Sequence, residues 1–414
     1  MTLQEQTAAA TPSIALDSRY SWFRLAVSLA AATVSGVGMW AVILVIPSVQ
    51  EEFGVDRSAA SLSYTSTMLG FALGNFAFGR MIDRFGITPA LIVAVLMIGS
   101  GFALAAATSA MWQFALVQGV LIGAGTSIGF GPLIADTSLW FNRRRGIAVA
   151  LVAAGNYAAG AIWPLIIKST LQTDGWRTTY FIIAIACTAI IIPLALVLRR
   201  RSPIRTKAGR DSLAASQPPL KPISLSPRAL QLILVVAGVA CCVAMSMPQV
   251  HIVAYCGDLG YGPVAGAEML SLMLAGGIAS RLTSGFLADY IGGLRTVLLG
   301  AVLQGVALLL YLPFDGLASL YVVSLIFGLS QGGIVPSYAI VVRDHMDARE
   351  AGQRVGLVMM STVVGMAFGG WLSGFIFDHT GSYQAAFLNG IAWNLLNVSI
   401  MTTLLWRSRR PRFA

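Results

Sequence analysis

The stretch from Leu274 to Arg295, LAGGIASRLTSGFLADYIGGLR, decides the class of this protein. It begins as an apolar segment, carries Arg281 in its middle and ends in a glycine-rich sequence around Asp289. A charged side chain inside a membrane-spanning helix costs roughly 2.5–3.5 kcal/mol on insertion scales, so it normally faces a cavity or a partner. Arg281 could instead snorkel to the headgroups, but it lies eight positions, about 12 Å of helix, from Asp289. A functional role for Arg281 is therefore favoured.

The composition predicts an integral membrane protein whose main partner is the lipid bilayer. Hydrophobic residues make up 57% of the chain, charged residues make up 11%, and the mean hydropathy is +0.77. Soluble domains carry about 25% charged residues. The net charge of +10 does not indicate nucleic-acid binding, because the arginines lie in short gaps between apolar segments rather than on one basic face. Residues 1–18 are polar and lack a signal-peptide pattern, so we expect the first apolar segment to be retained.

The sequence contains no pattern typical of catalysis, of a cofactor or of a metal site. The four cysteines, Cys187, Cys241, Cys242 and Cys256, lie in or at the ends of apolar segments without a CxxC spacing. An HExxH motif, a phosphate-binding loop and a metal-spaced His/Cys cluster are all absent from the sequence. We therefore expect a protein that is not an enzyme and that needs neither a metal nor a cofactor.

Twelve apolar segments, each near the 20 residues that a bilayer requires, predict an all-α membrane protein. The domains are expected to be a cytoplasmic tail (1–21), a six-helix bundle (22–198), a basic linker rich in Pro and Ser (199–227), a second six-helix bundle (228–406) and a short tail (407–414). The predicted spans are 22–46, 59–80, 89–108, 111–135, 144–168, 178–198, 228–256, 266–288, 295–313, 317–341, 353–377 and 384–406.

The distribution of Lys and Arg predicts the orientation. The linker and the loops on the side of both termini are rich in arginine, whereas the loops on the other side hold only Arg57, Lys168 and Arg177. By the positive-inside rule both termini are cytoplasmic. The short loops and the lack of a targeting segment favour a bacterial inner membrane, and we expect a monomer.

The two halves match each other when the chain is shifted by 206 positions. Seven pairs of identical residues then coincide, including an acid and an arginine at corresponding loops. Parallel repeats around a central site are typical of secondary transporters. The pairs are Gly79/Gly285, Asp83/Asp289, Gly86/Gly292, Arg143/Arg349, Gly146/Gly352, Gly175/Gly381 and Phe181/Phe387.

The loop Gly79-Arg-Met-Ile-Asp83-Arg84-Phe-Gly86 resembles the signature loop of the major facilitator superfamily, and the sequence from Gly285 to Arg295 resembles its second copy. The resemblance implies the fold of that superfamily, with two pseudo-symmetric six-helix bundles. Small residues let the helices approach closely, while the Asp and Arg form a charge-assisted latch at the helix ends. A purely structural ion pair is the alternative. The expected latch residues are Gly79, Asp83, Arg84, Asp136, Gly285, Asp289 and Arg295.

Two further segments resemble the monocarboxylate transporters and the bacterial oxalate/formate antiporters. These are WFNRRRGIAVA, from Trp140, with the following GNYAAG, and PQVHIVAY, from Pro248. Arg281 then falls where that group places its substrate-binding arginine. The chain departs from the group in having Gly277 where the animal transporters carry an aspartate, and no lysine near Ile43 or in the eleventh span. Proton coupling of the animal kind and dianion binding are therefore not expected.

Besides Arg281, several polar or aromatic residues within the spans are candidates for substrate binding. By the repeat, Asn75 takes the place in the second span that Arg281 takes in the eighth. His251 could donate to the substrate or carry a proton, although a structural histidine is the alternative. For the remaining candidates, packing between helices is an equal or more frequent alternative. They are Trp40, Gln118, Phe130, Asn156, Gln331 and Tyr338.

Together these features predict a secondary or facilitative transporter of a small organic anion, foremost a monocarboxylate. It would work by alternating access, as a symporter, an antiporter or a uniporter, with Arg281 binding the carboxylate and with protons as a second species that it could carry. The alternative is an antiporter that exports another metabolite or a drug. The Asp and Glu residues all fall in the tails, the loops or the ends of the predicted spans, which disfavours cationic drugs.

Overall fold

The computed structural model describes residues 16–141, 144–200, 223, 225–346 and 351–409. In these residues every regular element is a helix, and no strand occurs. The expected linker and the outer parts of both tails lie outside the described residues for the most part.

The helices of the N-terminal half alternate in direction, and the first and fourth spans are each built from more than one helical piece. Ser18 caps the first helix by accepting a hydrogen bond from the Ser21 amide at 3.3 Å. The helices are α1 (Arg19–Ser35), α2 (Val37–Phe53), α3 (Arg57–Phe85), α4 (Ile87–Ala106), α5 (Met111–Val117), the π-helix η1 (Gln118–Gly123), α6 (Ala124–Thr126), the 3-10 turn η2 (Ser127–Gly129), α7 (Gly131–Ser138), α8 (Arg145–Thr173) and α9 (Gly175–Val197).

The helices of the C-terminal half follow the same order, and its fourth span is again interrupted. Ser226 caps the first of them by accepting from the Ala229 amide at 3.2 Å. The helices are α11 (Pro227–Asp258), α12 (Gly262–Ile291), α13 (Gly293–Leu310), α14 (Leu317–Gln331), α15 (Ile334–His345), α16 (Ala351–Thr380) and α17 (Tyr383–Arg409).

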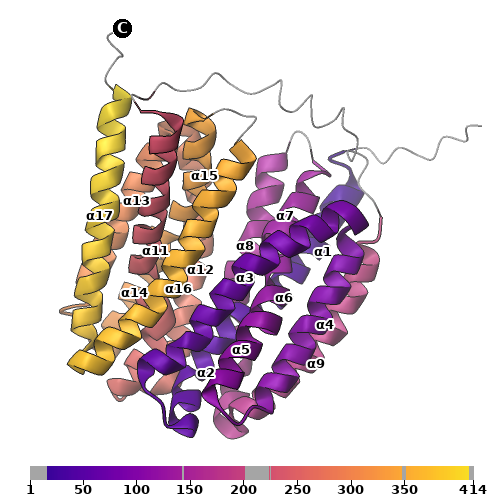
Figure 1. Ribbon diagram of the computed structural model, residues 1–414, viewed down its shortest axis with the longest axis vertical. Helices are drawn as coiled ribbons and strands as arrows, with labels where there is room; N and C mark the ends of the chain where they lie inside the picture. Colours follow the sequence, from indigo (N-terminus) through magenta and orange to yellow (C-terminus); the bar gives the residue numbers. More distant parts are fainter. Residues whose placement is uncertain (1–15, 142–143, 201–222, 224, 347–350, 410–414) are drawn as a thin grey trace, which may run out of the picture.

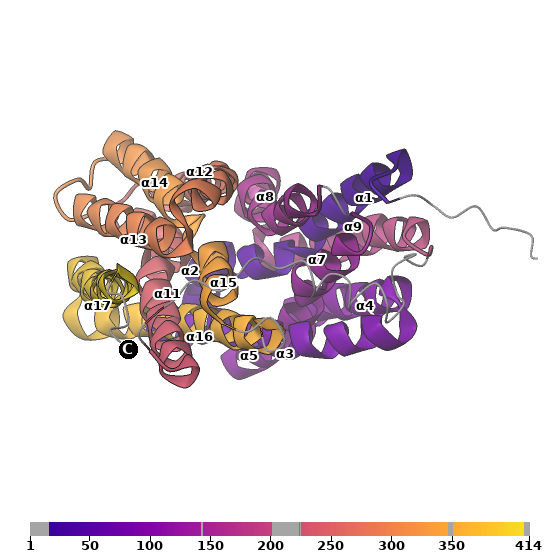
Figure 2. The same ribbon diagram turned by 90° about the horizontal axis from the view of Figure 1, so that it is seen from above.

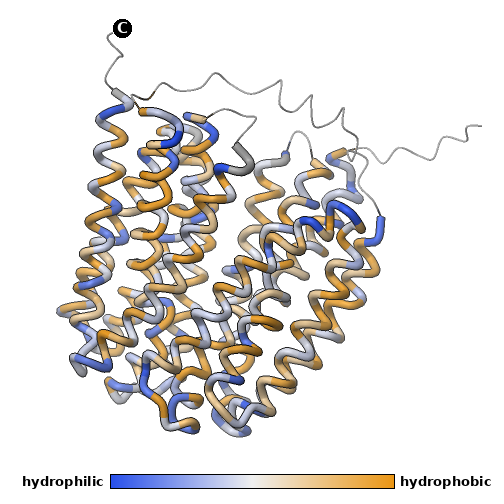
Figure 3. Tube along the Cα trace, in the orientation of Figure 1, coloured by the Kyte–Doolittle hydropathy of each residue, from blue (hydrophilic) through white to orange (hydrophobic). Residues whose placement is uncertain are grey.

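Helix length and hydropathy agree with twelve membrane spans. Eleven helical segments of the described chain are long and apolar enough to cross a bilayer. The twelfth is α3, whose 29 residues have the length but include many Ser and Thr side chains. Hydrophobic residues dominate the middle of the bundle, and hydrophilic ones concentrate at its two ends (Figure 3). The predicted fold class, an all-α membrane protein with two six-helix halves, is confirmed.

The two halves stand side by side, and their turns repeat the same backbone geometry (Figures 1 and 2). Three pairs of glycines separated by 206 positions all have positive φ, a conformation that glycine adopts at little cost. Gly86 and Gly292 have φ of 94° and 84°. Each lies between the second and the third span of its half. The other two pairs are Gly54 with Gly260 and Gly175 with Gly381.

The ends of the bundle are named here as they lie in Figure 1, so that α1 begins and α17 ends at the upper end. At the lower end the halves are tightly joined. A Cβ on Gly370 of α16 would lie 3.0 Å from the ring of Tyr64 of α3, and Thr65 donates to the Ala367 carbonyl at 2.9 Å. Toward the upper end the ribbons of the two halves diverge, and added Cβ atoms on Gly79 and Gly285 would meet nothing within 4 Å. The two halves are thus in close contact at the lower end, and their backbones lie farther apart at the upper end.

Candidate substrate site at the seam between the halves

Arg281 lies at the seam and contacts both halves of the molecule. It belongs to α12 and is 8% exposed. Its NH1 group donates to the Ala153 carbonyl of α8 at 2.8 Å, and its Nε donates to the Gly332 carbonyl at 3.3 Å. The guanidinium carbon lies 4.2 Å from the ring centroid of Tyr157, also of α8. The side chain is therefore held in place without being neutralised.

The guanidinium keeps unused donors. Arginine has five N–H groups. Two of them are spent on the carbonyls of Ala153 and Gly332, and the side chain also forms a hydrogen bond with Tyr157. None of the ion pairs in the described part of the chain involves Arg281. Nor is any of its nitrogens among the described polar atoms that are buried without a partner. The fork geometry of a guanidinium suits a carboxylate, and we expect the N–H groups that remain to serve an incoming anion.

The broken tenth span explains one of these contacts. Between α14 and α15 the helical pattern is interrupted at Gly332 and Gly333, and a break leaves carbonyls without a helical donor. The Gly333 carbonyl accepts from Ser337, while the Gly332 carbonyl accepts from Arg281.

Asn75 contacts the backbone at the break in the fourth span, as Arg281 does at the break in the tenth. Its Oδ1 accepts from the Gly131 amide at 3.1 Å, just after the distorted residue Phe130, and its Nδ2 donates to the Phe71 carbonyl. The side chain of Asn75 thus bonds to the backbone of its own half, at the break in the fourth span, and no contact with Arg281 is found among the described residues.

The ring of Tyr157, which lies against the Arg281 guanidinium, packs near Trp40 of the N-terminal half. Trp40 of α2 donates its Nε1 to the Asn156 carbonyl at 2.9 Å, and its ring lies 6.4 Å from that of Tyr157. A Cβ on Gly277, one turn before Arg281, would lie 3.3 Å from the Tyr157 ring. Gly277 thus leaves room for a tyrosine where the animal monocarboxylate transporters place a carboxylate. Asn156 itself faces inward, with its Nδ2 3.6 Å from the sulfur of Met39.

A pair of buried amides stands beside the break. Gln249 of α11 donates from its Nε2 to the Oε1 of Gln331 at 2.7 Å. The Nε2 of Gln331 has no partner, which is costly for a buried donor and leaves it available to a ligand. Gln331 was predicted as a candidate, whereas Gln249 was missed because glutamine next to Pro248 carries no distinctive signal.

His251 belongs to the lower end of the seam and shares no partner with Arg281. Its Nε2 lies 2.8 Å from the Gly370 carbonyl, which can only accept, so this nitrogen carries the hydrogen. Its Nδ1 lies 3.4 Å from the Tyr383 hydroxyl, which in turn bonds to Arg57. This arrangement fits the structural alternative for His251 and places it within a network that closes the lower end.

That network consists of ion pairs between the halves. Arg57 of α3 pairs with Asp258 of α11 at 3.0 Å, and Lys168 of α8 pairs with Glu268 of α12. In the sequence, Arg57 and Lys168 are distinctive only as rare basic residues on their side of the chain. Their acidic partners lie 201 and 100 positions away, and no local pattern could have matched them.

Three other candidates lie inside one half or the other. Gln118 donates to the Tyr180 hydroxyl at 2.6 Å within the N-terminal half. Tyr338 donates to Asn397 at 2.7 Å within the C-terminal half. The ring of Phe130 lies 6.0 Å from that of Phe71. The structure does not bring these three residues to Arg281.

The predicted latch residues lie at the upper end, where the ribbons of the two halves diverge (Figure 1). Asp83 and Arg84 are exposed, and neither forms an ion pair in the described chain. Arg295 is also exposed, and the side chain of Asp289 lies outside the described residues. The latch remains a prediction, and among the described residues Asp83 has no ion-pair partner.

Asp136, the third expected member of the first latch, has a different partner. It accepts from the NH2 group of Arg24 at 2.7 Å. Arg24 is 2% exposed, donates to the Leu198 carbonyl at 2.9 Å and lies 4.5 Å from the ring centroid of Trp140. This buried pair joins α1 to α7. It is not evident from the sequence, because Arg24 lies close to the predicted start of its span.

Comparison with known proteins supports the architecture. The family model described as the Major Facilitator Superfamily matches residues 28–293 and 257–413. Monocarboxylate transporter 13 of Bos taurus is 27% identical over 362 residues, which cover 84% of this chain and 81% of that protein. Agnestins efflux protein AgnL12 of Paecilomyces divaricatus is 24% identical, with coverages of 86% and 81%. The solved structure of the nucleoside transporter NupG aligns with a TM-score of 0.73 at 13% identity, covering 92% of this chain and 99% of that one.

Proposed function

The chain belongs to the Major Facilitator Superfamily and is a membrane transporter rather than an enzyme, and we propose that it carries a small organic anion, foremost a monocarboxylate. Arg281 would bind the carboxylate. The observation that carries this proposal is a buried guanidinium at the seam that bonds to two carbonyls and has no ion-pair partner among the described residues.

The charge balance of the site favours a monoanion. A buried charge without a counter-charge is unfavourable, and an incoming carboxylate that makes two parallel hydrogen bonds relieves this cost. Only one cation, Arg281, contributes to the contacts described here. A second carboxylate on the substrate would have to be buried without compensation, unless it carried a proton.

The form of the seam supports alternating access. Arg281 bonds to Ala153 of the other half, so the site forms where the two halves meet and changes when they rock against each other. The present conformation is closed at the lower end by Arg57 with Asp258 and by Lys168 with Glu268. Substrate would enter or leave at the upper end.

The upper end would face the cytoplasm. The start of α1, the end of α17 and the helix ends that carry Arg84, Arg295 and Arg343 belong to this end, as the positive-inside rule requires for cytoplasmic segments. We propose a monomer in a bacterial inner membrane, although the relatives compared here are eukaryotic. Protons, if they are carried, would travel on the substrate or through His251, since no carboxylate pairs with Arg281.

A counterflow assay in proteoliposomes tests the proposal. Vesicles loaded with an unlabelled short monocarboxylate should accumulate the labelled acid through the wild-type protein. Arg281→Gln should abolish this exchange while leaving the amount of folded protein unchanged or higher, because insertion becomes cheaper. Arg281→Lys should also be poor, because an ammonium group cannot make the two-pronged contact.

The control is Arg19→Gln, an exposed arginine at the start of α1, which should exchange normally. A well-folded Arg281→Gln protein that still moves a monocarboxylate at near wild-type affinity would refute the assignment. The second candidate, export of another metabolite, is suggested by the fungal efflux relative. It would be favoured if no carboxylate raised the unfolding temperature while a larger uncharged metabolite did.

A further inference from the structure

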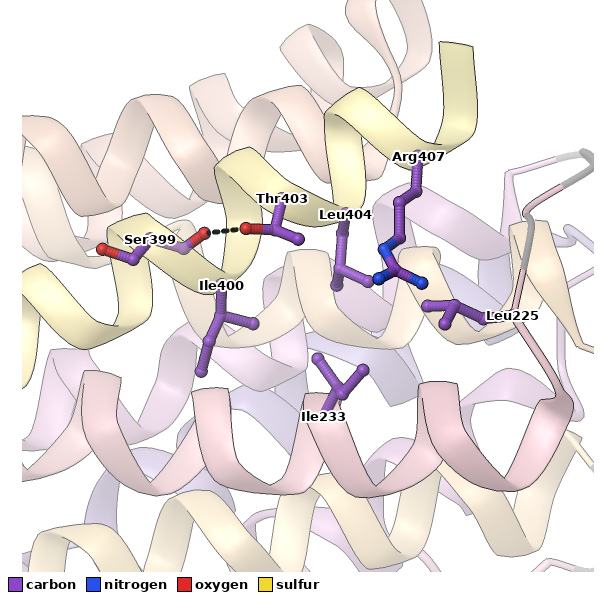
Figure 4. A pocket seen from close by; sticks show the side chains of 7 residues that line it. All are labelled: Leu225, Ile233, Ser399, Ile400, Thr403, Leu404 and Arg407. Carbon is purple, nitrogen blue, oxygen red and sulfur yellow. Dashed lines mark hydrogen bonds between the residues drawn. The ribbon is translucent and has the colours of Figure 1, made fainter. Parts of the chain in front are cut away.

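A groove on the C-terminal half lies between the start of α11 and the end of α17. Its volume is about 290 Å³. Leu225, Ile233, Ile400 and Leu404 form its apolar walls, and Arg407 stands at one end of it (Figure 4). None of these residues contacts Arg281, so the groove is separate from the candidate substrate site.

The two hydroxyl groups of the groove do not make it polar. Thr403 donates to the Ser399 carbonyl at 2.8 Å, and Ser399 donates to the Leu395 carbonyl at 2.7 Å. Both hydrogens are spent on the backbone of their own helix. The floor of the groove therefore offers hydrocarbon surface to whatever lies in it, and charge enters only through Arg407.

Positive charge gathers around this end of the groove from three helices. Arg407 of α17 and Arg228 of α11 are exposed, and Arg354 of α16 donates to the Pro227 carbonyl at 3.3 Å. The start of α11 adds the partial positive charge of a helix N-terminus. The sequence RSRRPR from 407 to 412 places four arginines directly after the last span, a pattern typical of binding to anionic lipids.

We propose that this groove binds an anionic phospholipid, with an acyl chain along the apolar walls and the phosphate at Arg407. Arg407 is expected at the level of the lipid headgroups, because its neighbour Trp406 is 53% exposed and such tryptophans lie at that level. A soluble anion would gain nothing from the apolar walls. A zwitterionic lipid would gain little from the arginines. Since α11 and α17 both line the groove, the lipid holds the two helices together.

Native mass spectrometry of the full-length protein in detergent tests the site. The probes are phosphatidylglycerol and phosphatidylcholine with the same two oleoyl chains, titrated separately. The wild-type protein should bind phosphatidylglycerol more tightly. Arg407→Gln should weaken the binding of phosphatidylglycerol about fivefold, which corresponds to about 1 kcal/mol for one arginine near the membrane surface, and should weaken the binding of phosphatidylcholine less. Arg19→Gln, an exposed arginine on the other half, is the matched control and should change neither.

A second variant tests whether the acyl chain lies in the groove. Thr403 is exposed, so Thr403→Trp should fold, fill the groove and weaken both lipids. The proposal is overturned if the wild-type protein binds the two lipids equally, or if Arg407→Gln and Arg19→Gln lose the same affinity. It is also overturned if Thr403→Trp, with an unfolding temperature like that of the wild type, retains phosphatidylglycerol fully.

Discussion

Replacing Arg57 by glutamine should shift the protein toward conformations in which the lower end of the seam is open. Arg57 is 8% exposed and bonds to both oxygens of Asp258 at 3.0 and 3.3 Å. Its guanidinium carbon also lies 4.7 Å from the ring centroid of Phe377. Asp258 and Phe377 belong to the other half, so these contacts exist only while the lower end is closed.

The size of the shift follows from these contacts. Because Asp258 is 37% exposed, the ion pair with its two hydrogen bonds contributes about 1–2 kcal/mol, near the lower end of the range for bonds to charged groups. The contact with Phe377 adds about 1 kcal/mol. Together the closed state loses about 2–3 kcal/mol, which is roughly a 30- to 150-fold change in the ratio of the two states.

A distance measurement between spin labels at the lower end can detect this change. Asp174 and Asp315 are exposed loop residues, one on each half, and cysteines at these positions would carry the labels. The four native cysteines are buried and should react slowly. Arg57→Gln should add a population with a longer distance between the labels.

Lys168→Gln is the matched control. Its ion pair with Glu268 also joins the halves, but the two side chains are 31% and 34% exposed. Such a pair contributes about 0–1 kcal/mol, so the ratio should change by less than about fivefold. The reasoning fails if a folded Arg57→Gln protein keeps the wild-type distance distribution, or if Lys168→Gln has the larger effect.

Three further predictions concern the interior. Gly277→Asp places a carboxylate one turn from Arg281, on a Cβ that would lie 3.3 Å from the Tyr157 ring. It should weaken anion binding at least tenfold in a thermal-shift titration. The neutral variant Gly277→Asn should weaken anion binding less in the same titration. Asp136→Asn leaves Arg24 buried without its counter-charge, so the free energy of unfolding should fall by about 3–5 kcal/mol, and wild-type stability in a chemical denaturation series would contradict this. His251→Gln should change the pH dependence of uptake if uptake depends on pH, and an unchanged profile would remove His251 from the proton route.

The candidate site was only partly predictable. Arg281 stood out because a charge inside an apolar span is costly enough to need a reason. Asn75 was located by the repeat, but its role at the break before Gly131 depends on backbone geometry that no residue pattern encodes. Gln118 and Tyr338 looked like pocket residues because they are polar and lie within spans. Hydropathy alone does not predict which face of a helix packs against a partner within its own half.

The sequence by itself determined the twelve spans, the division into two halves and the turns between them. These features depend on local properties, namely runs of apolar residues and glycines that adopt positive φ at matched positions such as Gly86 and Gly292. Only the tertiary structure decided which groups meet. Arg281 reaches Ala153 across 128 positions, and Arg24 reaches Asp136 across 112. A helix fixes the height and direction of a side chain, but its partner depends on how the helices pack, and this packing is settled by contacts between segments far apart in the chain.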